Sequence, residues 1–145
     1  MSVLELEKFL PYRMSVLSNR ISQGIAQTYE ERYGLTVPEW RVIAILGRHP
    51  GISATQVARY AAMDKVAISR AVKRLLEAGR VRRKDDNADR RAKQLWLSDA
   101  GERLYQAIVP AALAYEKALL SVLKDEEREQ LDRVLDKLQG AAELS

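Results

Sequence analysis

Apolar residues recur every three or four positions near the N-terminus, which is the spacing of one face of an α-helix. The stripe is formed by Leu10, Met14, Leu17, Ile21 and Ile25. It predicts a first long helix over about residues 6–29. Pro11 is tolerated if it lies in the first turn, whereas it would kink a helix that began earlier. Gly34 ends the element, because glycine readily adopts the left-handed conformation found after helices.

Two shorter helices follow, and each has a capping box at its start. In such a box a Ser or Thr side chain and a Glu or Gln side chain three residues later bond to each other's backbone N–H groups. Thr36 and Glu39 form the first box, and their helix ends before His49. Ser53 and Gln56 form the second box, which starts a short helix.

A fourth helix is predicted from Asp64, a favourable N-cap, to about Ala78, with Gly79 directly after it. About three residues separate it from the preceding helix, which is the connection length of a helix-turn-helix. The following segments have the period of strands: residues 81–84 form one, and residues 93–97 form the other. Turn-forming Asp and Asn residues lie between them. We call this predicted two-stranded hairpin the wing.

Two long helices complete the chain. Ser98 caps the first, which reaches about Leu123 and which Pro110 is expected to kink. The second runs from about Asp125 to Gln139. The predicted fold class is therefore mainly α with a small two-stranded β wing. We expect a single domain over residues 1–145, with a winged helix-turn-helix lobe at residues 34–98 and long terminal helices at residues 1–33 and 99–145.

The predicted fourth helix has two contrasting sides. One is aliphatic and consists of Ile68, Ala71, Val72, Leu75 and Leu76. The other carries Lys65, Val66, Ser69, Arg70, Lys73 and Arg74. Arginine can bond guanine with two hydrogen bonds, serine can bond a base or a phosphate, and valine can touch a thymine methyl. Because a helix-turn-helix reads bases with the start of its second helix, the first four of these residues are expected to contact bases and the last two to contact phosphates.

The wing concentrates positive charge. It carries Arg82, Arg83 and Lys84 before its tip and Arg90, Arg91 and Lys93 after it. These cations repel one another, and the repulsion is unfavourable unless a bound anion compensates for it. A thin cationic loop fits the minor groove of DNA. The Asp residues at the tip are interpreted as turn formers.

Composition and charge narrow the function. The net charge is +4, and residues 64–93 carry eleven Lys or Arg against five Asp or Glu, whereas residues 99–145 carry six against ten. This asymmetry favours nucleic acid as the partner, with an anionic membrane surface as the second choice. There is no cysteine and only one histidine, His49, so we expect neither a metal nor a cofactor. No apolar run approaches the roughly 18–20 residues of a membrane span and no secretory signal is visible, which favours the cytoplasm.

Three segments resemble the MarR family of winged helix-turn-helix repressors: Asp64–Arg70, Leu75–Val81 and Asp89–Gly101. The resemblance implies an obligate homodimer in which the terminal helices form the dimerisation region and two lobes bind a pseudo-palindromic operator in double-stranded DNA. It also implies that Asp64 pairs with Arg91 and fixes the wing against the fourth helix, while Arg90 enters the minor groove. Trp96 stands where the family often has a polar residue. Strand alternation places it outward, against arginine side chains or neighbouring backbone.

Apolar residues near both ends of the chain also favour a dimer, because they exceed what one small lobe can cover. Near the N-terminus they are Phe9, Leu10, Met14 and Leu17. Near the C-terminus they are Leu119, Leu120, Val122, Leu123, Leu131, Val134, Leu135 and Leu138.

Many members of the family respond to small aromatic acids or phenolic compounds that bind between the dimerisation region and the DNA-binding lobe. The candidate effector residues here are Tyr12, Arg13, Met14, Trp40, Arg41 and His49. An arginine can hold a carboxylate, and Trp40 or Tyr12 can stack on a ring. The alternative interpretation is core packing for Trp40 and Met14 and a simple turn role for His49 before Pro50.

The leading interpretation is a sequence-specific, DNA-binding transcriptional regulator, a homodimeric repressor released by a small aromatic effector and associated with the nucleoid when bound. A protein-interaction module that turns its basic face toward an acidic partner is the second interpretation. An enzyme that uses Glu39 or Glu77 is the third. It is disfavoured because capping explains Glu39, the helix surface explains Glu77, and no nucleophile or paired carboxylate accompanies them.

Overall fold

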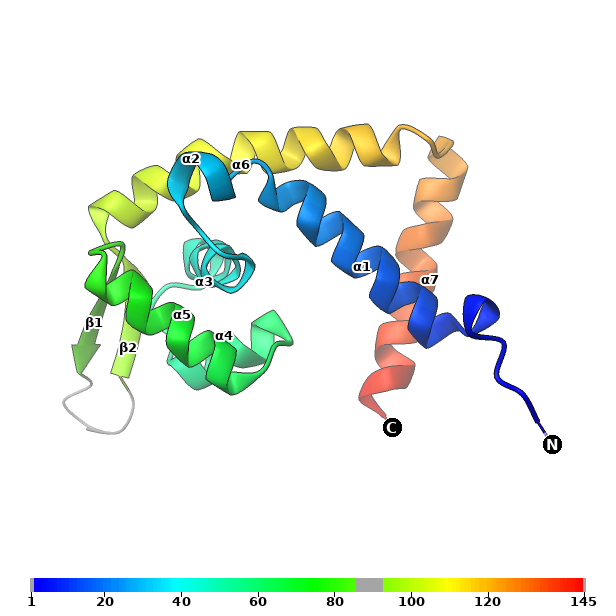
Figure 1. The fold of residues 1–145 in the computed structure, drawn as a ribbon, viewed down its shortest axis with the longest axis horizontal. Helices are drawn as coiled ribbons and strands as arrows, with labels where there is room; N and C mark the ends of the chain where they lie inside the picture. The colour runs from blue at the N-terminus through cyan, green and yellow to red at the C-terminus, as the bar shows by residue number, and fades with distance from the viewer. Residues whose placement is uncertain (1, 86–92, 145) are drawn as a thin grey trace. The chain divides into compact units, whose positions relative to one another are not determined.

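The computed structural model describes residues 2–85 and 93–144 and is mainly helical with one small antiparallel sheet (Figure 1). This confirms the predicted fold class. Two compact units are present, Met1–Ala111 and Ala112–Ser145. In order, the elements are the 3-10 helix η1 (Leu6–Lys8), α1 (Leu10–Ala26), α2 (Glu30–Tyr33), α3 (Val37–Arg48), α4 (Ala54–Ala61), α5 (Lys65–Glu77), β1 (Val81–Asp85), β2 (Lys93–Leu97), α6 (Asp99–Leu120) and α7 (Asp125–Glu143).

The single first helix predicted over residues 6–29 is wrong at both ends. Phe9 is extended and separates η1 from α1, so that Pro11 is the second residue of α1 and causes no kink. At the other end, the Thr28 hydroxyl donates to the Ile25 carbonyl at 2.6 Å. A side chain that takes a backbone carbonyl in this way competes with helix continuation. The chain turns there and buries Tyr29, which is 1% exposed, before the short α2 ends at Gly34 with φ +65°.

Helices α4 and α5 form the predicted helix-turn-helix. The Ser53–Gln56 capping box is complete: the Ser53 hydroxyl accepts the Gln56 N–H at 3.2 Å, and the Gln56 side chain accepts the Ser53 N–H at 2.9 Å. The connection to α5 consists of Ala62, Met63 and Asp64, which we call the corner. Asp64 occupies the N-cap position as predicted, but its side chain accepts no helix N–H among the described residues.

The predicted capping box of α3 is only half formed. Thr36 accepts the Glu39 N–H at 3.3 Å, as expected. The Glu39 carboxylate does not return to the Thr36 backbone; instead it accepts the Thr36 hydroxyl at 2.9 Å. The reason is the position of Glu39, which is 7% exposed and lies beside Arg74 of α5. Its negative charge therefore faces the helix-turn-helix.

The wing strands pair in the predicted antiparallel arrangement, with Arg83 opposite Leu95 and Val81 opposite Leu97. A third segment, which the sequence analysis missed, joins them. Leu95 donates its N–H to the Ile52 carbonyl at 2.9 Å and accepts the Gly51 N–H at 2.8 Å. This bridge ties the wing to the loop that precedes α4.

The core of the first unit lies where α3, α4, α5 and β2 meet (Figure 1). Its fully buried side chains include Leu46, Val57, Ile68, Leu75 and Leu95. Each such side chain contributes about 1.5–3 kcal/mol relative to an exposed one. The side of α5 that carries Ile68 and Leu75 is thereby fixed, and its opposite side faces solvent.

Ser98 starts α6 as predicted, because its hydroxyl accepts the Gly101 N–H at 3.1 Å. The helix is continuous through Pro110 and ends at Leu120, three residues before the predicted Leu123. It ends there because other groups satisfy its last carbonyls: the Arg128 guanidinium donates twice to the Leu120 carbonyl, at 2.9 and 3.2 Å.

Helix α7 extends to Glu143, beyond the predicted end at Gln139. Its apolar residues remain exposed, among them Leu131 at 38%, Val134 at 49% and Leu135 at 40%. Among the described residues no single helix is long and apolar enough to cross a membrane, and only the bent pair α6 and α7 meets that criterion jointly.

Gly101 and Gly140 should respond in opposite ways to replacement by alanine. A Cβ at Gly101 would meet the Arg80 carbonyl oxygen, whereas a Cβ at Gly140 meets nothing within 4 Å. We expect Gly101→Ala to lower the free energy of unfolding by about 1–3 kcal/mol through overpacking. Gly140→Ala should raise it by about 0.5–1 kcal/mol, because alanine is the better helix former. Urea unfolding of both variants measures the difference, and equal effects would contradict the packing at Gly101.

Candidate nucleic-acid interface

Helix α5 presents a continuous polar surface. Its core side is buried at Ile68, Ala71, Val72 and Leu75. All six residues predicted to contact DNA from this helix are exposed, and Val66 is 54% exposed. We call this surface the recognition face: Lys65, Val66, Ser69, Arg70, Lys73 and Arg74.

Arg74 differs from its neighbours on the recognition face. Its Nη1 lies 3.7 Å from Oε1 of Glu39, and its side chain is 58% exposed while that of Glu39 is 9% exposed. A buried carboxylate is costly unless a cation or hydrogen bonds compensate for it. Arg74 therefore compensates the buried carboxylate of Glu39. No described ion pair involves Lys73 or Arg70.

The cations of the first wing strand point to two different faces of the sheet. Arg82 pairs with Trp96 across the strands, and its guanidinium carbon lies 5.5 Å from the centre of the Trp96 ring. Arg83, on the other face, borders a shallow hollow of about 350 Å³ together with Ser69 and Lys73 of α5. Strand alternation places Lys84 on the face of Arg82. Of these cations, therefore, only Arg83 continues the recognition face.

The expectation for Trp96 is confirmed. Its ring lies against the arginine side chain of Arg82 on one side. A Cβ built on Gly51 would come within 3.2 Å of the ring, so backbone packs against it as well. The contact between the Arg82 guanidinium and the Trp96 ring contributes about 0.5–1 kcal/mol at an exposed site and places the arginine over the ring face.

Several predicted contacts lie outside the described residues. Arg90 and Arg91 belong to residues 86–92, and so does the implied pairing of Arg91 with Asp64. Asp64 itself is exposed at the corner, directly before α5. Lys93, at the start of β2, is also exposed and lies opposite Asp85 in the strand register.

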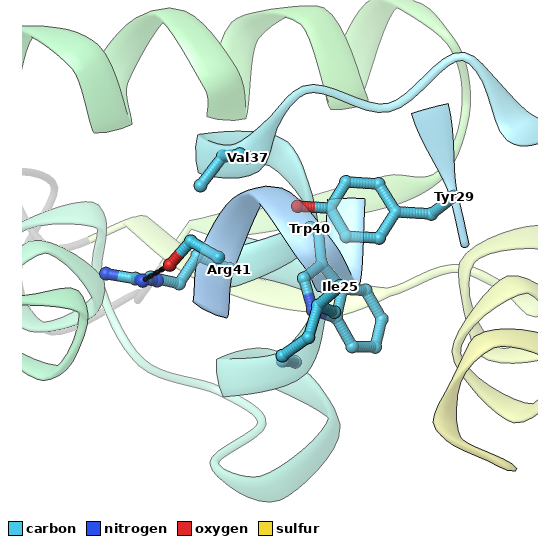
Figure 2. A pocket seen from close by; sticks show the side chains of 7 residues that line it. Ile25, Tyr29, Val37, Trp40 and Arg41 are labelled. Atoms are coloured by element: carbon cyan, nitrogen blue, oxygen red, sulfur yellow. Dashed lines mark hydrogen bonds between the residues drawn. The ribbon is translucent and has the colours of Figure 1, made fainter. Parts of the chain in front are cut away.

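A pocket of about 240 Å³ lies between α1 and α3 (Figure 2). It is lined by Ser22, Ile25, Tyr29, Val37, Trp40, Arg41 and Ala44. One wall is aromatic: the Trp40 ring lies between those of Tyr29 and Tyr105, at centroid distances of 5.7 and 6.5 Å. The opposite wall carries the Arg41 guanidinium. This group donates to the Ser22 hydroxyl at 3.3 Å and to the Ala61 carbonyl at 3.2 Å.

The hydroxyl of Tyr29 is a further polar group of the pocket. Figure 2 shows it pointing inward among the labelled side chains. Tyr29 is only 1% exposed. Burial raises the pKa of Tyr29 to about 12 from its ordinary value of 10.0, with a smaller contribution from Glu30. The hydroxyl is therefore protonated at neutral pH and available as a donor.

The structure brings only two of the six candidate effector residues into this pocket, Trp40 and Arg41. Tyr12, Arg13 and Met14 are exposed on α1 and do not line it. His49 stacks on the exposed Tyr60 ring at 4.3 Å, beside a second hollow that shares Arg41.

The sequence analysis missed the other five lining residues, Ser22, Ile25, Tyr29, Val37 and Ala44. The apolar stripe of the first helix contained Ile25, but no pattern in the sequence indicated which residues of α3 it would face.

Comparison with known proteins identifies this architecture. Residues 33–92 match the model of the MarR family. The structure of a MarR/EmrR family transcriptional regulator from Acinetobacter sp. ADP1 superposes with a TM-score of 0.89 at 25% identity, covering 98% of this chain and 100% of that one. By this match and this superposition the chain resembles the MarR family. The transcriptional regulator HosA of Escherichia coli O111:H- is 28% identical to this chain over 125 residues, which are 86% of the chain and 93% of HosA.

A third relative agrees in fold. Bordetella bronchiseptica BpsR, whose structure addresses regulation of its DNA binding by 6-hydroxynicotinic acid, has a TM-score of 0.82 and 21% identity, with 95% of this chain and 98% of BpsR covered. MarR-family proteins are transcriptional regulators that bind DNA and are not enzymes. This similarity argues against the enzyme interpretation of Glu39 and Glu77 and against a purely protein-binding role for the basic face.

The raised pKa of Tyr29 has a measurable consequence for stability. The native state keeps the proton that the unfolded chain releases near pH 10, so the Tyr29 contribution to the free energy of unfolding is constant at lower pH and declines as the pH rises from about 10 to 12. We expect Tyr29→Phe to remove on the order of 1–2 kcal/mol of this alkaline decline. Urea unfolding at several pH values measures it. Tyr12→Phe is the control, because its ring is 41% exposed; a decline of equal size in both variants would refute the assignment.

Proposed function

We propose that this chain is a homodimeric repressor that works in the cytoplasm and binds a pseudo-palindromic operator through α5 and the wing of each subunit. The observation that carries the proposal is the recognition face. Five polar or cationic residues and Val66 are exposed together on one side of a helix whose other side is buried. A helix of this kind at the second position of a helix-turn-helix enters the major groove.

Base reading is assigned to the first half of α5. Lys65, Val66, Ser69 and Arg70 lie within its first six residues and are exposed. The side chains supply donors for guanine, a hydroxyl for bases or phosphates, and an apolar contact for a thymine methyl. Arg70 is the principal candidate for sequence discrimination, because a bidentate pair with guanine is the commonest specific contact.

Phosphate contacts are assigned to the remaining cations. Lys73 and Arg83 border the same hollow between α5 and β1 and are placed to meet one strand of the backbone. Arg74 contributes less, because Glu39 shares its charge. The other wing cations assigned to phosphate contacts are Arg82, Lys84 and Lys93. By resemblance to the family, Arg90 enters the minor groove and Arg91 pairs with Asp64.

Dimerisation is assigned to the terminal helices, within a single domain over residues 1–145. The lobe comprises residues 34–98, and residues 1–33 and 99–145 contribute the interface. Exposed apolar side chains support this assignment, because a monomer in water would leave them uncovered. They are Phe9, Leu10, Met14 and Leu17 in the first unit and Leu113, Leu119, Val122, Leu131, Val134 and Leu135 in the second.

The pocket between α1 and α3 is proposed as the effector site. Its volume of about 240 Å³ is smaller than the roughly 300–1,000 Å³ of sites for drug-sized ligands and suits a single-ring compound. Trp40 provides a surface for the ring, Arg41 a partner for a carboxylate, and Tyr29 a protonated hydroxyl. BpsR, whose DNA binding is regulated by an aromatic acid, is a precedent. We propose that a small aromatic acid binds here and releases the repressor.

Arg70→Ala and Lys73→Ala should affect DNA binding differently. For duplexes selected from a random pool, Arg70→Ala is expected to cost about 1–3 kcal/mol and to relax the preference at one base pair. Lys73→Ala should weaken binding evenly across sequences and reduce the slope of log K against log salt by about 1. Anisotropy titrations over a range of salt concentrations measure both effects.

Two results would contradict this assignment. One is an Arg70→Ala variant that keeps both the affinity and the sequence preference of the wild type. The other is wild-type protein whose binding is absent or insensitive to salt for every duplex, because phosphate contacts release counterions and make affinity depend steeply on salt.

Leu135→Gln is expected to weaken the dimer by about 2 kcal/mol, since each subunit places a polar amide where a leucine is buried. Glu129→Gln on the opposite face of α7 is the matched control and should leave association unchanged. Sedimentation equilibrium measures both. A monomeric wild type, or equal effects of the two substitutions, would rule out this interface.

A further inference from the structure

Arg41 connects two parts of the molecule that the proposed function treats separately. Its guanidinium forms a wall of the pocket, where Nη2 donates to the Ser22 hydroxyl of α1 at 3.3 Å. The same group reaches the helix-turn-helix, where Nη1 donates to the Ala61 carbonyl at 3.2 Å. Arg41 is the residue that both lines the pocket and bonds to the backbone of α4.

The Ala61 carbonyl lies at a sensitive point of the chain. Ala61 is the last residue of α4, so its carbonyl has no partner within that helix. The next residue, Ala62, is the one non-glycine residue with positive φ in the described part of the chain, at +51°. This left-handed conformation is unfavourable for alanine and persists only when its surroundings maintain it.

The corner determines where α5 begins. Ala62, Met63 and Asp64 are the whole connection, and Lys65 and Val66, the first residues of the recognition face, follow at once. With so short a connection, a change in the last turn of α4 is transmitted directly to the start of α5. The Arg41–Ala61 hydrogen bond therefore bears on the part of α5 that is assigned to base reading.

We propose that Arg41 is a positioning residue for DNA binding, and that an anion captured in the pocket acts on the corner through it. This inference rests on the proposed function, because it assumes that the pocket binds an acidic effector and that α5 binds DNA. A guanidinium is planar, so its donors move together. A carboxylate that pairs with Arg41 turns this plane toward the pocket and draws Nη1 away from the Ala61 carbonyl. The corner then loses its support and α5 loses its register for DNA.

The test compares the wild type, Arg41→Gln, Arg41→Lys and Ser22→Ala as full-length proteins, with benzoate as the anionic probe and benzamide as its neutral analogue. Anisotropy titrations with a selected duplex give DNA affinity, and calorimetry gives benzoate binding. Hydrogen exchange of the peptide amides around residues 59–66 reports on the corner. Thermal unfolding verifies that each variant is folded.

We expect Arg41→Gln without any probe to bind the duplex about tenfold more weakly, as loss of a hydrogen bond from a charged donor implies. Its salt dependence should stay that of the wild type, because Arg41 does not touch phosphate. Benzoate should weaken DNA binding of the wild type and accelerate exchange at the corner, and benzamide should do neither. In Arg41→Gln, benzoate should have no further effect.

The two other variants separate the charge from the geometry. Arg41→Lys keeps the positive charge but cannot hold two acceptors with one planar group; it should bind benzoate and yet transmit little of that binding to DNA. Ser22→Ala removes only the pocket-side hydrogen bond of Arg41, keeps the Ala61 hydrogen bond, and should retain wild-type DNA affinity in the absence of benzoate.

Two results would overturn the inference while leaving the proposed function intact. They are wild-type DNA affinity in Arg41→Gln and an undiminished benzoate response in Arg41→Gln or Arg41→Lys. Wild-type protein that binds DNA but not benzoate would overturn the inference together with the proposed effector site. Failure of the wild type to bind any duplex is a different outcome, which overturns the proposed function itself.

Discussion

The packing of the aliphatic side of α5 against α3 is the interaction on which the proposed DNA-binding surface depends. Ile68 and Leu75 are 1% exposed or less, and so are Ile43 and Leu46 of α3. Once this side of α5 is buried, the residues on the other side of the helix face solvent. The charge of the recognition face contributes little to the fold. The aliphatic side supplies the stability, and the polar side is left to serve binding.

A buried carboxylate and a buried phenol show how polar groups are used near this core. Glu39 accepts the Thr36 hydroxyl and faces Arg74, so its charge is compensated and helps to orient α5 relative to α3. Tyr29 lines the pocket and packs its ring against Trp40, and its burial raises the pKa of its hydroxyl to about 12. The carboxylate therefore serves the packing of two helices, whereas the phenol contributes a protonated hydroxyl to the wall of the pocket.

Local rules predicted much of the fold, and long-range contacts account for what they missed. The Ser53 capping box, the two wing strands and the cap at Ser98 depend on neighbouring residues and agree with the structure. The end of α1 depends on how deeply Tyr29 is buried, and the bridge between Ile52 and Leu95 joins residues 43 positions apart. The recognition face followed from one helical period. The pocket did not, because its two walls come from helices whose mutual orientation no local pattern encodes.

The bridge from the wing to the loop before α4 is made entirely of main-chain groups. Exposed side chains on the two wing strands can therefore be exchanged without detaching the hairpin, whereas a proline at Gly51 or Leu95 would remove a donor of the bridge. A scaffold anchored in this way separates the evolution of sequence preference from the maintenance of architecture. Related proteins can acquire new target sites by altering the exposed positions of the hairpin, and the attachment beneath them needs no compensating change.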